Sequence, residues 1–248
     1  LGLALDKKGE QRQARMLLRH ATLLTKRDDL TNAWLMQDYS RSGDIRGMLR
    51  YVDISSRVNP ATAGVYAKIM VPALQQPSTW PIFHDILQRH PSWEKDFWNA
   101  AVANEAALDG AAKLRQTIYS EDEQAIDANL LQRLVGANKL ASAAELVDAR
   151  LGGSKAIVKN GDFTQQPTLP PFDWSLVSTG SFGAFIDTEK KALIASAISG
   201  ATGEVASEIV QIPPGRYQLS ASRAANYGGG EGSTTIRLAC SADGTGPS

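Results

Sequence analysis

The sequence has very few of the residues that build disulfides and metal sites. Among its 248 residues are 1 cysteine, Cys240, and 3 histidines. A single cysteine excludes an internal disulfide and leaves the cellular compartment open. The histidines His20, His84 and His90 are scattered and lack the paired spacing of a zinc site. We therefore expect surface histidines on helices, a buried Cys240 on a strand and no cofactor.

The sequence also lacks an excess of one charge and a long apolar run. Lys+Arg and Asp+Glu both number 26, so the formal net charge is zero. A protein that binds nucleic acid usually carries a basic surplus, so we expect no nucleic-acid partner. No apolar run approaches the ~20 residues that span a bilayer, and no signal segment opens the chain. Because Leu1 is not a methionine and a helical pattern follows at once, we expect a fragment of a longer protein.

Motifs of catalysis are missing as well. The glycine-rich run 228–232 lacks the Lys-Ser/Thr of a phosphate loop, and no Gly-x-Ser-x-Gly nucleophile elbow is present. Two carboxylate pairs, Asp187 with Glu189 and Glu204 with Glu208, fall on shared strand faces, and a glycosidase needs such a pair. We interpret both pairs as solvated strand edges and predict that the chain is not an enzyme.

Glycine is unevenly distributed and divides the chain in two. Residues 1–150 hold 7 of the 21 glycines, and residues 151–248 hold 14. Each glycine costs a helix interior about 1 kcal/mol relative to alanine. The change therefore indicates a helical domain over residues 1–152 and a strand-rich domain over residues 153–248.

Apolar residues in the first domain recur at helical spacing. We predict about nine helices, with Thr31 as the N-cap of the second. Trp80, Trp93 and Trp98 are expected to anchor helix packing rather than to bind ligands. The predicted helices cover residues 10–26, 31–41, 45–58, 63–74, 78–90, 111–119, 122–135 and 139–151, with one more beginning near residue 92.

Part of this pattern repeats after 34 residues. With that shift, Gly9 falls on Gly43 and Leu18 falls on Val52. A 34-residue period of paired helices is the tetratricopeptide signature, and residues 32–60 resemble one such repeat. The resemblance implies a short α-solenoid of antiparallel helical hairpins.

Such solenoids present a concave groove to partner peptides or proteins. Gln37 and Arg41 lie on the first helix of the recognisable repeat, which by the resemblance lines that groove. The resemblance thus implies a protein partner and makes these two residues candidates for contacting it. The alternative is that both residues belong to an ordinary solvated helix face.

The second domain carries short apolar or alternating segments separated by turn residues. Such spacing is typical of a β-sandwich. The expected strands begin at Ile157 and cover residues 174–177, 182–186, 192–198, 204–212, 216–222 and 234–240.

Three motifs in this domain resemble carbohydrate-binding modules of the galactose-binding-like jelly-roll type. They are the sequence NGDF at residues 160–163, the downstream Trp174, and the strand and Pro-Gly-Arg-Tyr turn at residues 212–220. The resemblance implies an antiparallel jelly roll and an oligo- or polysaccharide ligand. Because such modules are longer, we expect this one to be incomplete at its C-terminal end.

Sugar sites combine an aromatic plate with a few planar polar groups. Trp174, Arg223, Asn226 and Tyr227 supply those groups, with Trp174 also interpretable as a core residue. Many jelly-roll modules hold a structural calcium ion, for which Asp162 is a conceivable ligand without further support in the sequence.

These expectations combine into a multidomain α plus β protein, a non-catalytic scaffold. A helical protein-interaction region would be joined to a carbohydrate-binding-like sandwich, in a bacterial envelope or polysaccharide-handling system. A periplasmic or envelope location is favoured, with a cytoplasmic one as the alternative. Three other functions stay open: a protein–protein adaptor with a structural sandwich, a non-catalytic fragment of a larger glycan-active enzyme, and a glycosidase within the sandwich that uses Asp187 or Glu204.

Overall fold

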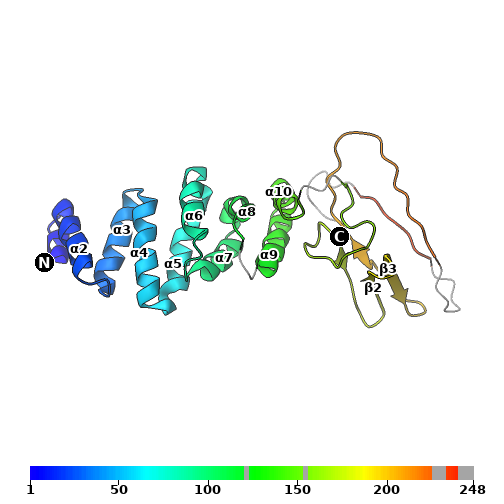
Figure 1. The fold of residues 1–248 in the computed structure, drawn as a ribbon, viewed down its shortest axis with the longest axis horizontal. Helices are drawn as coiled ribbons and strands as arrows, with labels where there is room; N and C mark the ends of the chain where they lie inside the picture. The colour runs from blue at the N-terminus through cyan, green and yellow to red at the C-terminus, as the bar shows by residue number, and fades with distance from the viewer. Residues whose placement is uncertain (120–122, 153–155, 225–232, 240–248) are drawn as a thin grey trace. The chain divides into compact units, whose positions relative to one another are not determined.

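The computed structural model describes residues 1–119, 123–152, 156–224 and 233–239 (Figure 1). The chain divides into two compact units, Leu1–Ala137 and Asn138–Ser248. The first unit is helical, and the second contains one helix and four short strands in its described part. The predicted domain boundary after residue 152 stays a prediction.

The helical unit is confirmed as a run of packed helices (Figure 1). Each predicted helix has a counterpart, and α1 is an additional one. Short 3-10 turns at Pro60–Thr62, Val71–Gln75, Pro77–Thr79 and Glu105–Ala107 connect several of them. The α-helices are α1 (Gly2–Lys7), α2 (Gln11–Leu24), α3 (Asp29–Arg41), α4 (Ile45–Val58), α5 (Ala63–Met70), α6 (Trp80–Leu87), α7 (Glu94–Ala103), α8 (Leu108–Arg115) and α9 (Glu123–Gly136).

Local side chains set the ends of the α3–α4 hairpin. The Asp28 carboxylate accepts a hydrogen bond from the backbone N–H of Thr31 at 3.3 Å, so Asp28 is the N-cap of α3 and the prediction of Thr31 was wrong. Thr31 instead donates its hydroxyl to Asp28 at 2.7 Å. Asp44 caps α4 by accepting from the N–H of Gly47 at 2.8 Å. These carboxylates satisfy donors that a helix start leaves unpaired.

Aromatic side chains fill the middle of the helical unit. Trp93 and Trp98 have exposed fractions of 0% and 1%, which confirms them as packing residues. Phe97 stacks on Phe83 at 5.3 Å between ring centroids. Trp80 is half-buried and donates its Nε1–H to the carbonyl of Leu74 at 2.8 Å. The helices are therefore anchored by a shared aromatic core.

The second unit begins with α10 (Leu140–Arg150) and continues into two small antiparallel sheets. In one, β1 (Ser175–Leu176) pairs with β4 (Ala206–Ser207), with Ser175 opposite Ser207. In the other, β2 (Phe182–Asp187) pairs with β3 (Ala192–Ala197) over six residue pairs. The antiparallel strands are confirmed, but the described residues form no complete jelly-roll sandwich.

Several predicted strands are absent from the described part of the second unit. Residues 216–222 and 234–239 have no regular secondary structure, and their apolar side chains are exposed, including Tyr217 at 52% and Leu238 at 71%. The start at Ile157 lies in a bend rather than a strand. An alternating pattern forms a strand only where a neighbouring strand accepts and donates its backbone hydrogen bonds. Cys240 lies outside the described residues.

The segment before β1 is organised around a buried carboxylate. Asp173, with an exposed fraction of 4%, accepts hydrogen bonds from the backbone N–H groups of Thr168, Leu169 and Trp174. Phe163 contacts Trp174 with 5.5 Å between ring centroids. Phe163 of the NGDF motif and the downstream tryptophan are thus brought together, a contact that the sequence analysis did not predict.

Candidate functional site

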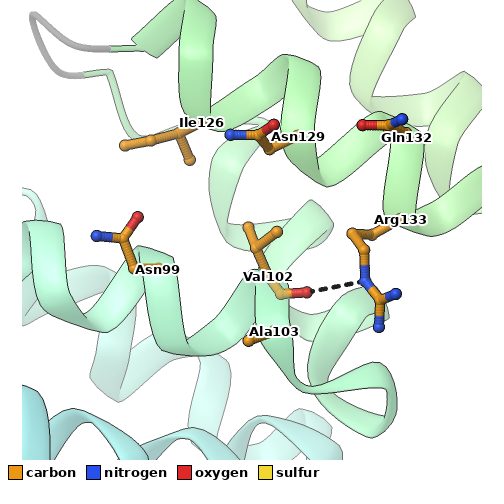
Figure 2. Close-up of a pocket in the computed structure, with 7 residues that line it drawn as sticks. All are labelled: Asn99, Val102, Ala103, Ile126, Asn129, Gln132 and Arg133. Carbon is orange, nitrogen blue, oxygen red and sulfur yellow. Dashed lines mark hydrogen bonds between the residues drawn. The ribbon is translucent and has the colours of Figure 1, made fainter.

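Two adjoining hollows lie along α9 and share the residues Gln132 and Arg133. The first lies between α9 and α7, and the second lies between the end of α9 and Glu105, which follows α7 in the 3-10 turn Glu105–Ala107. The first has a volume of about 300 Å³ (Figure 2). The second has a volume of about 370 Å³. We call them together the α7–α9 groove. Its lining comprises Asn99, Val102, Ala103, Glu105, Ile126, Asn129, Gln132, Arg133, Gly136 and Ala137.

Helical periodicity places the lining residues of each helix on one face. On α7, Asn99 and Val102 are three residues apart, and on α9 the same holds for Ile126 and Asn129. Residues at this spacing are neighbours on a helix surface. Figure 2 shows Ile126 and Asn129 on α9 above Asn99 and Val102 on α7. Two faces that each combine polar and apolar side chains therefore oppose each other across the first hollow.

Arg133 links the two walls of the groove. Its Nε–H donates to the backbone carbonyl of Val102 at 3.4 Å (Figure 2). Val102 lies in the last turn of α7, where carbonyls have no partner within the helix. The contact engages the Nε–H of an exposed side chain, and the guanidinium has further N–H donors on its Nη atoms. The groove thus presents a positioned cation beside neutral carboxamides.

A buried ion pair supports these helices from within the unit. Arg115 of α8 donates its Nε–H to Asp127 of α9 at 2.6 Å, and the exposed fractions of the two side chains are 0% and 2%. The guanidinium carbon of Arg115 lies 5.1 Å from the ring centroid of Trp98 on α7. Trp98 in turn donates its Nε1–H to Glu94 at 3.0 Å. These contacts connect α7, α8 and α9, and so set the spacing of the groove walls.

The residues predicted to line a partner groove lie elsewhere on the helical unit. Gln37 and Arg41 are both exposed on α3, four residues apart. Between them, Asp38 is buried and forms an ion pair with Arg15 of α2. Neither Gln37 nor Arg41 lines the α7–α9 groove, and their role in partner binding stays a prediction.

The predicted sugar-binding residues are only partly described. Trp174 is half-buried against Phe163, and its Nε1 is buried without a hydrogen-bond partner among the described residues. Arg223 is exposed in the irregular segment after β4. Asn226 and Tyr227 lie outside the described residues. A site that combines all four side chains therefore stays a prediction.

Glu208 has an environment that the sequence did not reveal. The backbone N–H of Lys159 donates to its Oε1 at 2.6 Å, and its Oε2 is buried without a partner in the described part of the chain. Burial raises the pKa of Glu208 to about 8, and the negative charge of Asp173 adds to the rise. The interpretation of Glu208 as a solvated strand edge was wrong, because Glu208, which directly follows β4, is half-buried and accepts a hydrogen bond from the backbone N–H of Lys159.

The other carboxylates of interest are ordinary surface groups. Asp187 ends β2 and accepts from the backbone N–H of Lys190 at 2.9 Å, which lowers its pKa. Glu189 lies in the following turn rather than on the same strand face, and Glu204 is exposed. Asp162 is exposed and accepts from the Thr164 hydroxyl at 3.1 Å. In the residues described, no three His, Cys, Asp or Glu side chains gather as metal ligands would.

Comparison with known proteins assigns no family. The chain matches no protein-family model, no curated protein and no solved structure. None of the helices in the described ranges combines the length and hydropathy of a membrane-spanning segment. The residues of the chain itself therefore carry the argument for function.

Sequence reasoning missed the α7–α9 groove. The signal was present in part, because Asn129, Gln132 and Arg133 are polar residues at neighbouring positions of a predicted helix. Their partners on α7 belong to a helix that is separated from α9 by the whole of α8. The hollow becomes visible only in the structure, where α7 packs against α9 and both helices contribute lining residues.

Proposed function

We propose that the chain is a non-catalytic binding protein whose helical unit docks a segment of a partner protein. The observation that carries this proposal is the α7–α9 groove, whose polar lining consists of three carboxamides, the guanidinium of Arg133 and the carboxylate of Glu105. Carboxamides both donate and accept hydrogen bonds, as peptide groups do. Among the described residues, the groove lining holds no serine, cysteine or histidine, and its one carboxylate, Glu105, has no nucleophile beside it in that lining to activate. Binding therefore fits these side chains better than catalysis does.

The helical architecture supports the same proposal. Extended stacks of helices commonly use a surface between neighbouring helices to hold partner segments. We attribute the α3–α4 hairpin to a tetratricopeptide-like repeat, with Gln37 and Arg41 as a secondary contact surface. In that arrangement the α7–α9 groove provides the principal site.

For the second unit we propose a carbohydrate-binding-like module that contacts an oligo- or polysaccharide. Its support is the half-buried Trp174 packed beside Phe163, together with the exposed Arg223. Aromatic rings stack on the C–H faces of sugars, and a guanidinium donates to ring hydroxyls. A glycan array probed with the full chain and with Arg223→Ala tests this part. Absence of binding to every glycan would leave a protein–protein adaptor as the function.

A display library of random 12-residue peptides, selected on the full immobilised chain, tests the protein-docking part. We expect enriched sequences that bind the native chain and lose binding to the double variant Asn129→Ala, Gln132→Ala. Arg50→Gln on α4 serves as a control because Arg50 is exposed and lies outside the groove. No enrichment over a blank surface, or equal binding to the double variant, would contradict the proposal.

A further inference from the structure

We propose that the α7–α9 groove binds an extended peptide that carries an aspartate or glutamate side chain, with Arg133 as the partner of that carboxylate. This inference rests on the proposed docking function and adds the chemical class of the ligand. Its grounds are the charge, the hydrogen-bonding groups and the size of the groove.

The charge of the first hollow is positive. Among the described residues that line it, Arg133 is the only charged one. The bond from its Nε to the Val102 carbonyl orients the guanidinium, with the Nη groups on the opposite edge. Guanidinium groups bind carboxylates through parallel hydrogen bonds that are stronger than those between neutral groups. An acidic side chain is therefore the ligand group that complements this hollow.

The neutral polar groups suit a peptide backbone. Asn99, Asn129 and Gln132 each offer an N–H₂ donor and a carbonyl acceptor. Such groups pair with the C=O and N–H of an extended chain irrespective of its side chains. In the described part of the chain no aromatic residue lines either hollow, and sugar sites usually require such a ring as a stacking plate. The lining therefore favours a peptide over a glycan.

The size of each hollow suits an extended segment. A strand fills roughly 160 Å³ per residue, from a cross-section of about 4.8 by 10 Å and a rise of about 3.3 Å. One turn of helix, about 10 Å across and 5.4 Å long, needs about 420 Å³. The hollows of about 300 and 370 Å³ each hold about two extended residues and less than one helical turn.

The second hollow carries a negatively charged group, which disfavours acidic residues of the peptide. Glu105, an exposed residue, lines it together with Gln132 and Arg133. A carboxylate there disfavours a second acidic side chain at that end of the peptide, since like charges repel. The groove should therefore select one acidic residue followed or preceded by neutral or basic residues, rather than a uniformly acidic segment.

Capped peptide pools provide the test, because acetylated and amidated ends remove terminal charges. Each pool of octapeptides fixes one position as Glu, Gln or Lys and randomises the others, and binding to the full chain is measured by fluorescence polarisation. We expect the best Glu pool to bind about tenfold more tightly than the matching Gln pool, and more tightly still than the Lys pool. Arg133→Gln should remove that preference, and Arg50→Gln should retain it.

The outcomes separate this inference from the docking function. A Glu preference that Arg133→Gln removes supports both. Binding without a Glu preference, or a preference that survives Arg133→Gln, overturns this inference and leaves the docking function standing. No binding by any pool overturns both. Because Arg133 is exposed, its variant should keep the melting temperature of the native chain, and a folded variant makes each outcome interpretable.

Discussion

Arg115 and Asp127 form an ion pair that is closed off from solvent, with 2.6 Å between Nε and Oδ1 and exposed fractions of 0% and 2%. The two residues come from α8 and α9, and the guanidinium also lies over the ring of Trp98 on α7. A pair in this position holds three helices at a fixed separation. The width of the α7–α9 groove therefore depends on residues that do not line it.

Removing one partner of this pair should strongly destabilise the helical unit. Asp127→Ala leaves the Arg115 charge buried and uncompensated, which typically costs about 3–5 kcal/mol. Urea unfolding followed by tryptophan fluorescence measures the loss. The double variant Arg115→Leu, Asp127→Leu should be less destabilised than Asp127→Ala, because no buried charge is left. A loss below about 1 kcal/mol for Asp127→Ala would show that the pair is not isolated from water.

Gly110 should not tolerate a methyl group. A Cβ at this position of α8 would lie 2.5 Å from the carbonyl oxygen of Leu74 and 2.9 Å from Trp80 Nε1. Gly110→Ala should therefore cost roughly 1–3 kcal/mol, as overpacking does in other cores. Gly64→Ala is the matched control, since its Cβ would meet only Asp96 Oδ1 at 3.7 Å. That variant should be neutral or slightly stabilising, and equal losses for both would contradict the packing around α8.

Removing the N-cap of α3 should cost less stability than the changes in the core, because it affects one helix end. Asp28→Ala removes the acceptor for the N–H of Thr31 and should cost about 1 kcal/mol. The hydrogen bonds from Thr31 lower the pKa of Asp28, so its contribution is present at neutral pH and is lost on acidification. Asp29→Ala, which alters a neighbouring carboxylate that does not cap the helix, provides the comparison in thermal unfolding. Identical melting temperatures for the two variants would argue against Asp28 as the cap.

The second unit should lose stability as the pH rises. The pKa of Glu208 is raised from 4.5 to about 8, so the folded state holds a proton that the unfolded chain releases. The protonated Glu208 carboxyl makes its full contribution to the stability of the fold below about pH 4.5, and that contribution is lost as the pH rises through about 8. The groups nearest to this carboxyl are the Asp173 carboxylate and Lys159, whose backbone N–H is bound to it.

Glu208→Gln should remove this dependence, because the amide stays neutral and its oxygen still accepts from Lys159. Limited proteolysis of the full chain at pH 6 and pH 9 measures the difference, with cleavage after residue 156 as the readout. We expect faster cleavage at pH 9 in the native chain, measured against a reference peptide that corrects for the protease's own pH dependence. Equal pH dependence in the native chain and in Glu208→Gln would contradict the assignment.

Local signals made the helices predictable. The helix expected at residues 45–58 is α4, Ile45–Val58, because its cap Asp44 and the following Pro60 are encoded at its ends. The strands were harder, because pairing depends on distant residues. Residues 182–186 and 192–198 are joined by a short turn and do form β2 and β3. Residues 216–222 have the same alternating pattern but no partner strand among the described residues.

The candidate site was less predictable than the fold. The groove residues Asn129 and Arg133 are polar positions on a predicted helix, and nothing in the local sequence distinguishes them from Gln37 and Arg41 on α3. What distinguishes them is that α7 packs beside α9 and supplies an opposing wall. Glu208 similarly owes its raised pKa to burial, which follows from its packing against a segment 49 residues away in the chain.

The most direct test of the account is a cross-link from the groove itself. Benzoylphenylalanine is introduced in place of Ala103, an exposed residue of the groove lining. A second version carries it in place of Arg50 on α4 as the control. On irradiation, the Glu-containing capped peptides should cross-link to the variant with benzoylphenylalanine at position 103 and not to the variant with it at position 50. Labelling from position 50 alone, or from neither position while the peptides still bind, would contradict the α7–α9 groove as the docking site.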